Sequence, residues 1–262
     1  MTGRTLTDTA FSPHAKGLVT VKIIAVSMVK NEEDIIELII RNLFSQGIDE
    51  MIVSDNMSSD GTRGILDRLA VEFPITVLDD LDPAYHQSRK MTALAHLAGA
   101  AGADWIVPFD ADELWRGTNG TIRDMLAGST AGVAAAPMLE HHPRPTLRRG
   151  GLLERMPWAR HLGYAKVAFR WNENIVLIDG NHNVENAGGP LVWDLLTVHH
   201  FPMRSFKQWQ RKALQGAAAV ELADWPADMA PVWRTVARSS RREIRMRWWL
   251  LRLELKLRYR PI

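Results

Sequence analysis

The sequence predicts an α/β protein with a mainly parallel sheet, helices on both faces of that sheet, and mixed strands in the second half. Strand-like apolar runs alternate with helix-like segments between residues 21 and 109, which is typical of parallel sheets with right-handed crossovers. An acidic or amide cluster also follows each of these apolar runs. Beyond residue 113, short apolar runs are joined by Gly, Pro and Asn, which predicts mixed or antiparallel additions to the sheet.

Residues 1–19 are polar and lack periodicity, so we expect them to form a flexible lead-in. Val21 to Val29 reads as a buried strand, and the helix after it ends at Gly47. Asn31 is either the N-cap of that helix or a ligand-binding residue. The other expected elements of the first half are strands at 51–53, 75–78 and 104–109 and helices through 65–69 and 87–101.

The second half is expected to carry short strands at 133–136, 166–170, 175–178 and 195–198, then a helix over 204–222. We therefore expect a catalytic domain over residues 20–222 and a basic, Trp- and Arg-rich helical extension over 223–262. In an open parallel sheet, ligands bind in a crevice beyond the carboxyl ends of the strands. The polar clusters at 30–32, 54–56, 79–82 and 110–113 lie at these ends.

Composition narrows the class of protein. The chain has 262 residues, 46% hydrophobic and 24% charged, which fits one globular domain with room for a small subdomain. It contains no Cys, which excludes disulfides, thiolate metal sites and Cys nucleophiles. Nothing resembles a signal peptide or a membrane span, so we expect a cytoplasmic protein, free or peripheral at the inner face of the membrane.

The net charge of +2 hides a polarity along the chain. Residues 1–140 carry a net charge of −9 and the remainder carries +11. This pattern is explained either by a metal-binding half that meets an anion-binding half, or by a solvated basic tail.

Asp110 and Asp112 are the strongest chemical signal in the sequence. They follow an apolar strand and are flanked by Trp105 and Trp115. Carboxylate oxygens at this spacing suit Mg²⁺ or Mn²⁺, which also accept phosphate oxygens. Such an ion can neutralise a departing diphosphate. The alternative is a turn with solvated carboxylates.

Four motifs in order resemble the family 2 glycosyltransferases, which have the GT-A fold. The first three are Lys30-Asn31-Glu32, Asp55-Asn56-Met57-Ser58-Ser59-Asp60-Gly61-Thr62 and Asp110-Ala111-Asp112-Glu113, and the fourth is His200-Phe201-Pro202-Met203-Arg204-Ser205. They resemble the subgroup with KNE, DN-S-DGT, DADE and HYP-RS motifs, over roughly residues 20 to 222. Met57 departs from the Ser that is usual there.

The resemblance implies inverting transfer of a sugar from a nucleotide-diphosphate donor of UDP or GDP type. By the same resemblance, Asp55 contacts the nucleobase, and Val29, Asn31 and Glu32 lie beside the base and ribose. Arg89 lies near the donor, and Asp110 and Asp112 surround the metal and diphosphate. His200 is the candidate third ligand of Mn²⁺ or Mg²⁺.

The basic helix after His200 supplies candidate phosphate-binding groups. We expect Arg204 and Lys212 to hold diphosphate, and we expect Arg211 to be solvated. An inverting transfer also requires a base for the acceptor hydroxyl. Glu140, Glu185 and Asp194 are alternative candidates for the catalytic base, and the sequence does not separate them. His182 is a further candidate for binding acceptor or metal.

The C-terminal segment from Arg238 to Arg260 reads as a helix with two apolar stripes. Ile244, Trp248, Leu251 and Leu255 form one stripe, and Met246, Leu250, Leu253 and Leu257 form the other. One stripe can dock on the domain while the other faces an anionic membrane or a partner protein. The alternative is that both stripes pack against protein.

The expected acceptor is a carbohydrate or a lipid-linked molecule, and no nucleic-acid-binding module is recognisable. Two rival functions remain open at this point. A nucleotide-sugar-forming nucleotidyltransferase needs a Gly-rich basic loop after the first strand, where this chain has the acidic Lys30-Asn31-Glu32-Glu33-Asp34. A non-catalytic sugar-nucleotide-binding module would not need the intact Asp110 and Asp112 pair.

Overall fold

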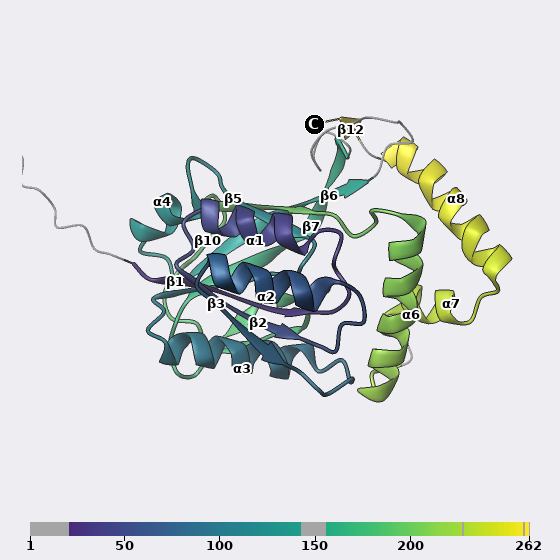
Figure 1. Ribbon diagram of the computed structural model, residues 1–262. Helices are drawn as coiled ribbons and strands as arrows, with labels where there is room; N and C mark the ends of the chain where they lie inside the picture. Colours follow the sequence, from purple (N-terminus) through teal and green to yellow (C-terminus); the bar gives the residue numbers. More distant parts are fainter. Residues whose placement is uncertain (1–20, 143–155, 227, 259, 262) are drawn as a thin grey trace, which may run out of the picture.

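The computed structural model describes residues 21–142, 156–226, 228–258 and 260–261 (Figure 1). Its first half contains four parallel strands in the order β3-β2-β1-β4. These strands are β1 (Ile23–Val29), β2 (Glu50–Asp55), β3 (Ile75–Asp79) and β4 (Trp105–Pro108). The order reverses beside β1, which is the kind of position where open parallel sheets bind ligands.

Helices connect these strands as the periodicity predicts. They are α1 (Ile36–Ser45), α2 (Thr62–Glu72) and α3 (Gln87–Ala100), and a short α4 (Ile122–Ala127) follows later. Thr121 caps α4 through a capping box with Asp124, because the threonine oxygen accepts from a free backbone N–H at the helix start. α1 begins at Ile36, with Ile35 as its N-cap, so Asn31 does not cap this helix.

The second half adds strands of mixed direction, as expected. The sheet continues β4-β7-β6-β11-β5, in which β7 is antiparallel to both neighbours and β11 runs parallel to β6 and antiparallel to β5. The long strands here are β6 (Val133–His142) and β7 (Trp158–Arg170), with β5 (Glu113–Gly117) and β11 (Leu196–His200) beside them. The expected strand at 175–178 is only β8 (Val176–Leu177), which pairs with β9 (Val184–Glu185) in a separate hairpin. The 3₁₀ turn η1 (Asp179–Asn181) lies between β8 and β9, and β10 (Leu191–Val192) and β12 (Arg260–Pro261) pair with β6 and β7.

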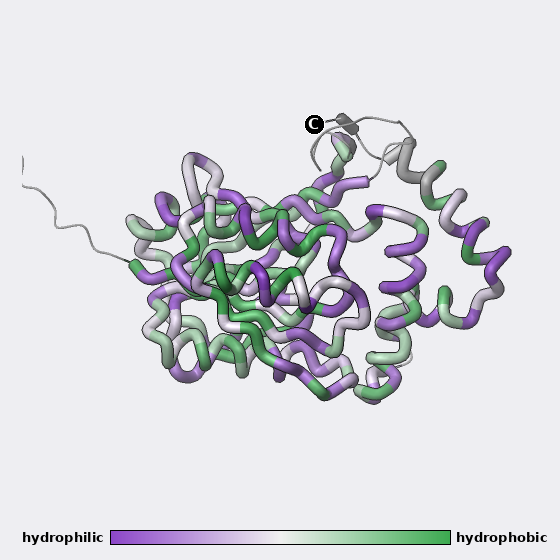
Figure 2. The backbone as a smooth tube through the Cα atoms, in the orientation of Figure 1, coloured by the Kyte–Doolittle hydropathy of each residue, from purple (hydrophilic) through white to green (hydrophobic). Residues whose placement is uncertain are grey.

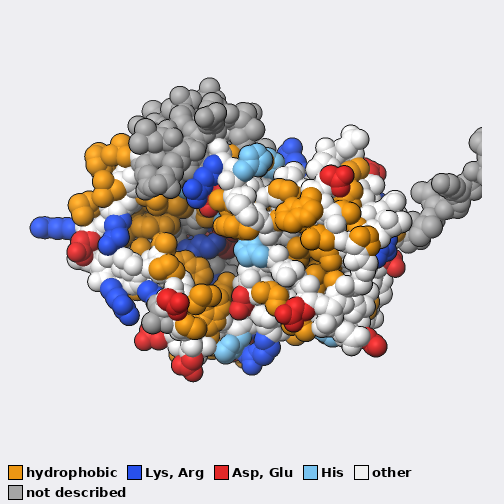
Figure 3. Space-filling view, turned by 180° about the vertical axis from the view of Figure 1, so that it is seen from behind, with side chains coloured by type: hydrophobic (Ala, Val, Ile, Leu, Met, Phe, Trp, Pro, Cys, Tyr) orange, Lys and Arg blue, Asp and Glu red, His pale blue; other side chains and the backbone are white. Residues whose placement is uncertain are grey.

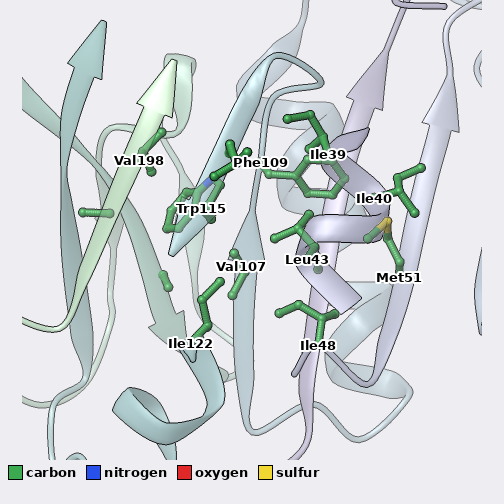
Figure 4. Packing of buried hydrophobic residues seen from close by; sticks show 14 of the residues in the cluster. Ile39, Ile40, Leu43, Ile48, Met51, Val107, Phe109, Trp115, Ile122 and Val198 are labelled. Carbon is green, nitrogen blue, oxygen red and sulfur yellow. The ribbon is translucent and has the colours of Figure 1, made fainter. Parts of the chain in front are cut away.

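Alternate side chains of β1 pack into two apolar cores, one on each face of the sheet. Ile23 and Ala25 join the core under α1, α2 and α4, whereas Ile24 and Val26 join the core under α3. In the first core, Ile39 and Leu43 of α1 lie beside Phe109 and Val107, and Ile40 lies beside Met51, as Figure 4 shows. The hydrophobic stretches of the tube in Figure 2 accordingly run along the strands. Burial of alternate residues on both faces fixes the strand register.

Three helices form the C-terminal end of the molecule, at the right of Figure 1. They are α6 (Phe206–Leu222), α7 (Pro231–Ala237) and α8 (Arg241–Arg258). The helix expected from Arg238 is α8, which begins three residues later at Arg241, because Ser240 and Glu243 form a capping box at its start. In the part of the chain that the structure describes, no helix has the length and hydropathy to cross a membrane.

Candidate functional site

A cavity of about 580 Å³ opens where the loops after β1 and β4 meet α6 and the end of β11. Figure 3 shows a hollow on this face, with basic side chains inside and hydrophobic side chains around it. One part of the lining is charged and the other is apolar or aromatic. The charged and polar part includes Lys30, Glu32, Lys90, Asp110, Asp112, Glu140, Lys166, His182, His200 and Lys212, and the apolar part includes Met203, Trp209, Ala213, Val232 and Trp233.

The loop after β1 is held in place by Asn31. Its backbone has φ of +57°, a conformation that Asn tolerates better than most residues. Its side-chain Oδ1 accepts hydrogen bonds from the backbone N–H groups of Ser59 (2.7 Å) and Asp60 (3.2 Å). Asn31 is 3% exposed and does not line the cavity. It therefore joins the loop after β1 to the loop after β2.

Asp110 lies between β4 and the cavity and is held by Lys166 of β7. Lys166 Nζ donates to Asp110 Oδ2 at 2.7 Å and lies 2.9 Å from Glu113 Oε1. Asn181 Nδ2 donates to the other oxygen, Asp110 Oδ1, at 3.2 Å. Burial would raise the pKa of Asp110, but Lys166 holds that pKa below its usual value. Asp110 is therefore an oriented, ionised carboxylate.

Asp112 is held from the opposite direction by α6. Lys212 Nζ donates to Asp112 Oδ2 at 2.5 Å, and His200 Nε2 lies 3.7 Å from Asp112 Oδ1. Burial opposes ionisation of Asp112, yet Lys212, His200 and Arg204 keep the pKa of this carboxyl well below its ordinary range. Burial would lower the pKa of Lys212, but Asp112 and Glu32 raise it.

His200 lines the cavity, and burial favours the neutral form of its imidazole ring. Burial lowers the pKa of His200, although Asp112 opposes that effect. Its Nδ1 is buried without a hydrogen-bond partner among the described residues. On the neighbouring strands, its register partners are Glu140 of β6 and Glu113 of β5. These three side chains consequently lie in one row across the sheet.

Arg204 lies outside the cavity lining, contrary to the expectation that it contacts phosphate. Its guanidinium is bonded to Glu32 and to Asp34, the latter at 2.8 Å, and it lies 3.6 Å from Asp112 Oδ2. Arg211 was expected to be solvated, but it donates to the carbonyl of Asn31 at 2.5 Å and pairs with Asp60 at 3.0 Å. Both arginines fasten α6 to the first half of the chain.

The structure separates the three candidate bases. Glu140 lines the cavity, where Arg160 Nη2 donates to its Oε1 at 2.9 Å and His142 Nε2 lies 3.3 Å from the same oxygen. Glu185 on β9 and Asp194 before β11 are exposed and do not line the cavity. His182 lines it, and its Nδ1 is 2.8 Å from the carbonyl oxygen of Ala165.

Of the residues expected to contact the nucleotide, some line the cavity and others do not. Val29 and Glu32 line the cavity. Asp55 is buried at the end of β2, and Asn56, the next residue, lines the cavity in its place. Arg89 points to the surface, 69% exposed, and pairs with Asp82. Its neighbour Lys90 lines the cavity instead, with its Nζ 2.7 Å from Asp80 Oδ2.

Sequence reasoning missed Lys166, Lys90 and the aromatic part of the cavity lining. A signal existed for Lys166, because it is a charged residue beside the apolar run Val167-Ala168-Phe169, and a buried charge requires a partner. Trp209 and Trp233 gave no comparable signal, since tryptophans on a helix are more often core residues than binding residues. Tyr85, which also lines the cavity, makes edge contacts with Trp225 and Trp233.

The comparisons with solved structures give partial overlaps. S. aureus TarS 1-349 in complex with UDP overlaps with a TM-score of 0.48 at 11% identity, over 83% of this chain and 70% of that chain. Glucosyl-3-phosphoglycerate synthase from Mycobacterium tuberculosis, in complex with Mn²⁺, UDP and phosphoglyceric acid, overlaps with a TM-score of 0.33 at 19% identity, over 57% of this chain and 56% of that chain. The sequence matched no curated protein.

The comparison with protein families gives a match for the first half of the chain. Residues 25–127 match the family described as Glycosyl transferase family 2. This range extends from β1 through α4 and includes the loop with Asp110 and Asp112. Over these residues the chain is similar to that family, and the match supports a glycosyltransferase.

Proposed function

We propose that the protein transfers a sugar from a nucleoside diphosphate to an acceptor hydroxyl group, with inversion at the anomeric carbon. The observation that carries this proposal is the meeting of Asp110, Asp112, His200 and Lys212 at one cavity at the carboxyl ends of the parallel strands. This arrangement offers carboxylates for a cation and an ammonium for a diphosphate within a single site.

The donor set fits a divalent cation that shares its ligands with the substrate. Asp112 Oδ1 and His200 Nε2 are 3.7 Å apart, a separation compatible with two ligands of one small cation, since each metal–ligand bond is about 2.1 Å. Among the described residues, no three His, Asp or Glu side chains form a ready cage. Mg²⁺ and Mn²⁺ commonly take remaining ligands from phosphate and water.

In this proposal Asp112 and His200 would hold the cation, with Asp110 beside them. The cation would supply a Lewis acid for the departing diphosphate. Lys212 places a positive charge beside Asp112. Its ammonium donates to the diphosphate as its bonds to Asp112 and Glu32 are replaced. Arg204 keeps Glu32 turned toward Lys212.

Glu140 is the base of the proposed reaction. Its carboxylate takes the proton of the acceptor hydroxyl while the acceptor oxygen forms a bond to the anomeric carbon. The bond between that carbon and the phosphate oxygen breaks, and its electron pair leaves with the nucleoside diphosphate. Glu140 lies on the strand next to His200, so the base and the diphosphate site are neighbours in the row across the sheet.

The acceptor is proposed to be a carbohydrate or a lipid-linked molecule. The apolar part of the cavity lining, which we call the aromatic wall, includes Met203, Trp209, Val232 and Trp233. Aromatic side chains bind both sugar faces and hydrocarbon, because their ring faces are apolar and polarisable. This wall is the natural place for the acceptor part of the substrate pair.

Calorimetric titration of the full chain with UDP and with GDP, each with and without Mn²⁺, tests the donor site. We expect one of them to bind in a Mn²⁺-dependent manner. Lys212→Met should weaken that binding roughly 10- to 100-fold, because a charge-assisted hydrogen bond contributes about 1.5–3 kcal/mol. Asp112→Asn should remove the Mn²⁺ dependence.

Lys207→Met is the matched control, since Lys207 is exposed on the same helix, and it should bind like the wild type. If neither nucleotide binds with or without Mn²⁺, the proposal fails. A panel of nucleotide-sugars assayed for slow hydrolysis then separates an enzyme from a non-catalytic binding module, because only an enzyme releases free sugar.

A further inference from the structure

Helix α8 presents two different faces. One face docks on the molecule through Ile244, which is 3% exposed, together with Trp248 and Leu251. The ring of Trp248 lies 5.4 Å from that of Trp209 and 6.0 Å from that of Phe206, both on α6. The position and rotation of α8 are therefore set by aromatic packing.

The opposite face of α8 is apolar and exposed. Met246, Trp249, Leu250 and Leu253 are 56%, 60%, 50% and 39% exposed. Their spacing of three, four and seven residues places them on one side of the helix. At about 100° per residue, the centre of this stripe lies roughly opposite the docked Ile244, Trp248 and Leu251.

Arginines flank this exposed stripe. Arg245 lies on one side of it and Arg247 on the other, Arg242 lies at its N-terminal end, one turn before Met246, and all three are exposed. Arg238 and Arg241 add two more exposed positive charges at the start of the helix. No ion pair joins any of these five arginines to another part of the chain that the structure describes. Figure 2 shows hydrophilic and hydrophobic turns following one another along this helix.

We propose that α8 seats the protein on an anionic lipid surface. An apolar stripe with Trp, flanked by arginines, matches the boundary between acyl chains and negatively charged headgroups. The docked face of α8 keeps the helix axis in the plane of that surface, because the apolar stripe points directly away from the protein. This inference rests on α8 alone and does not depend on the proposed function.

Charge argues against a second copy of the chain as the occupant. In a two-fold dimer the same surface meets itself, and the arginines of the two copies would repel each other. The 31 residues from Val232 to Ile262 carry a net charge of +8. An anionic surface removes that repulsion and compensates each exposed charge.

Flotation of the full chain with vesicles tests the proposal. We expect the protein to float with vesicles of phosphatidylcholine and phosphatidylglycerol and to remain unbound with phosphatidylcholine alone. Binding should weaken as salt is added, because salt screens the arginines. Replacing Arg242, Arg245 and Arg247 together by Gln should weaken binding by about fivefold per charge removed.

Trp249→Ala combined with Leu250→Ala should weaken vesicle binding by roughly tenfold or more at equal salt, because both side chains would lie in the apolar layer. Val71→Ala is the matched apolar control, since Val71 is 88% exposed on α2, and Arg116→Gln is the matched charge control. The thermal unfolding midpoint of each variant shows whether α8 is still docked, because none of these side chains lies on the docked face.

The proposal is overturned if the wild type does not float with anionic vesicles. It is equally overturned if the Trp249 and Leu250 variant binds as well as the wild type while remaining folded. A dimer in sedimentation that Trp249→Ala dissociates, with no vesicle binding, would assign the stripe to a second copy instead.

Discussion

Lys166 separates the behaviour of two neighbouring carboxyl groups. Its ammonium group lies within 2.9 Å of both Asp110 and Glu113, and Glu113 is completely buried. Burial raises the pKa of Glu113 to about 8, although Lys166 opposes that shift. The same ammonium lowers the pKa of Asp110. Near neutral pH the lysine therefore balances the charge of Asp110, and it opposes the effect of burial on the pKa of Glu113.

Glu140 carries the residue-scale prediction for the base. Glu140→Gln should lower kcat by roughly 100-fold or more, because general-base catalysis contributes about 10²–10⁴-fold. Binding of nucleoside diphosphate, measured by calorimetry, should stay within about twofold of the wild type. Glu185→Gln and Asp194→Asn are the matched variants and should leave kcat unchanged. A large loss of kcat in either, with Glu140→Gln active, would transfer the role of base.

Asn31 shows what residue-level reasoning can and cannot recover. The sequence identified it as a residue of interest, with a helix cap or a nucleotide contact as its role. The prediction of a helix cap was wrong, because α1 begins five residues later, at Ile36. Its partners, Ser59 and Asp60, are 28 and 29 residues away in the chain. Such a bond depends on the pairing of β1 with β2, which no local pattern specifies.

Helix α6 is the element that completes the site. Its N-cap Ser205 accepts from the backbone N–H of Gln208, which fixes where the helix begins. From that start, Trp209 and Lys212 face the cavity. The sequence predicted this helix and its basic face, but it did not predict that Glu32 and Asp60 would pair with that face.

Replacing two glycines by Ala should change the free energy of unfolding in opposite directions. A Cβ on Gly132, just before β6, would lie 1.4 Å from the backbone oxygen of Gly188, so Gly132→Ala should lower the free energy of unfolding by about 1–3 kcal/mol or more. Gly64 lies inside α2 with nothing within 4 Å of such a Cβ. Gly64→Ala should raise the free energy of unfolding by roughly 0.4–1 kcal/mol.

Urea denaturation followed by circular dichroism measures both glycine variants. Each serves as the control for the other, because both add one methyl group. Equal stability of Gly132→Ala and the wild type would show that the loop around Gly188 can move aside at little cost.

Most elements of the first half could be predicted, because strands and helices there are continuous apolar or periodic runs. The ends of β6 and β7 could not, since polar residues such as Glu140 and Lys166 interrupt the apolar pattern where the strands line the cavity. The short strand β5 was also missed. It begins at Glu113, a residue that sequence reasoning assigned to a ligand-binding cluster rather than to a strand.

At the scale of the whole molecule, the charge polarity of the sequence has a structural counterpart. The acidic first half and the basic second half meet in ion pairs across the cavity. Glu32 and Asp112 pair with Lys212, and Asp110 pairs with Lys166. The remaining positive charge lies on α8 and the segment beside it. The halves of the chain are thus held together by the same groups that form the proposed donor site.

Acid should weaken the whole fold through the pair of His141 and His199. His141 Nε2 and His199 Nδ1 are 2.8 Å apart, and the contact joins β6 to β11. Burial lowers the pKa of His199 to about 4, and His141 reinforces that shift. Between about pH 6.5, the unfolded value, and pH 4, the unfolded chain binds a proton at His199 that the folded chain does not.

The free energy of unfolding should therefore fall as pH decreases through that window, with a slope that includes about one proton from His199. His199→Phe should flatten the slope by that proton, whereas the exposed His161→Gln should not change it. Urea titrations between pH 4 and pH 7 give the slope directly. An unchanged slope in His199→Phe would show that His199 is protonated equally in both states.

The position of Trp209 links two distant parts of the molecule. It lines the cavity, and its ring also supports Trp248 of α8 at 5.4 Å. One side chain is thus both part of the cavity lining and a packing partner of α8. A ligand large enough to displace the Trp209 ring would also displace the Trp248 ring of α8. The packing of α8 therefore limits how far this part of the cavity lining can move. The size of the ligand that the cavity can accept is consequently coupled to how tightly α8 packs on α6.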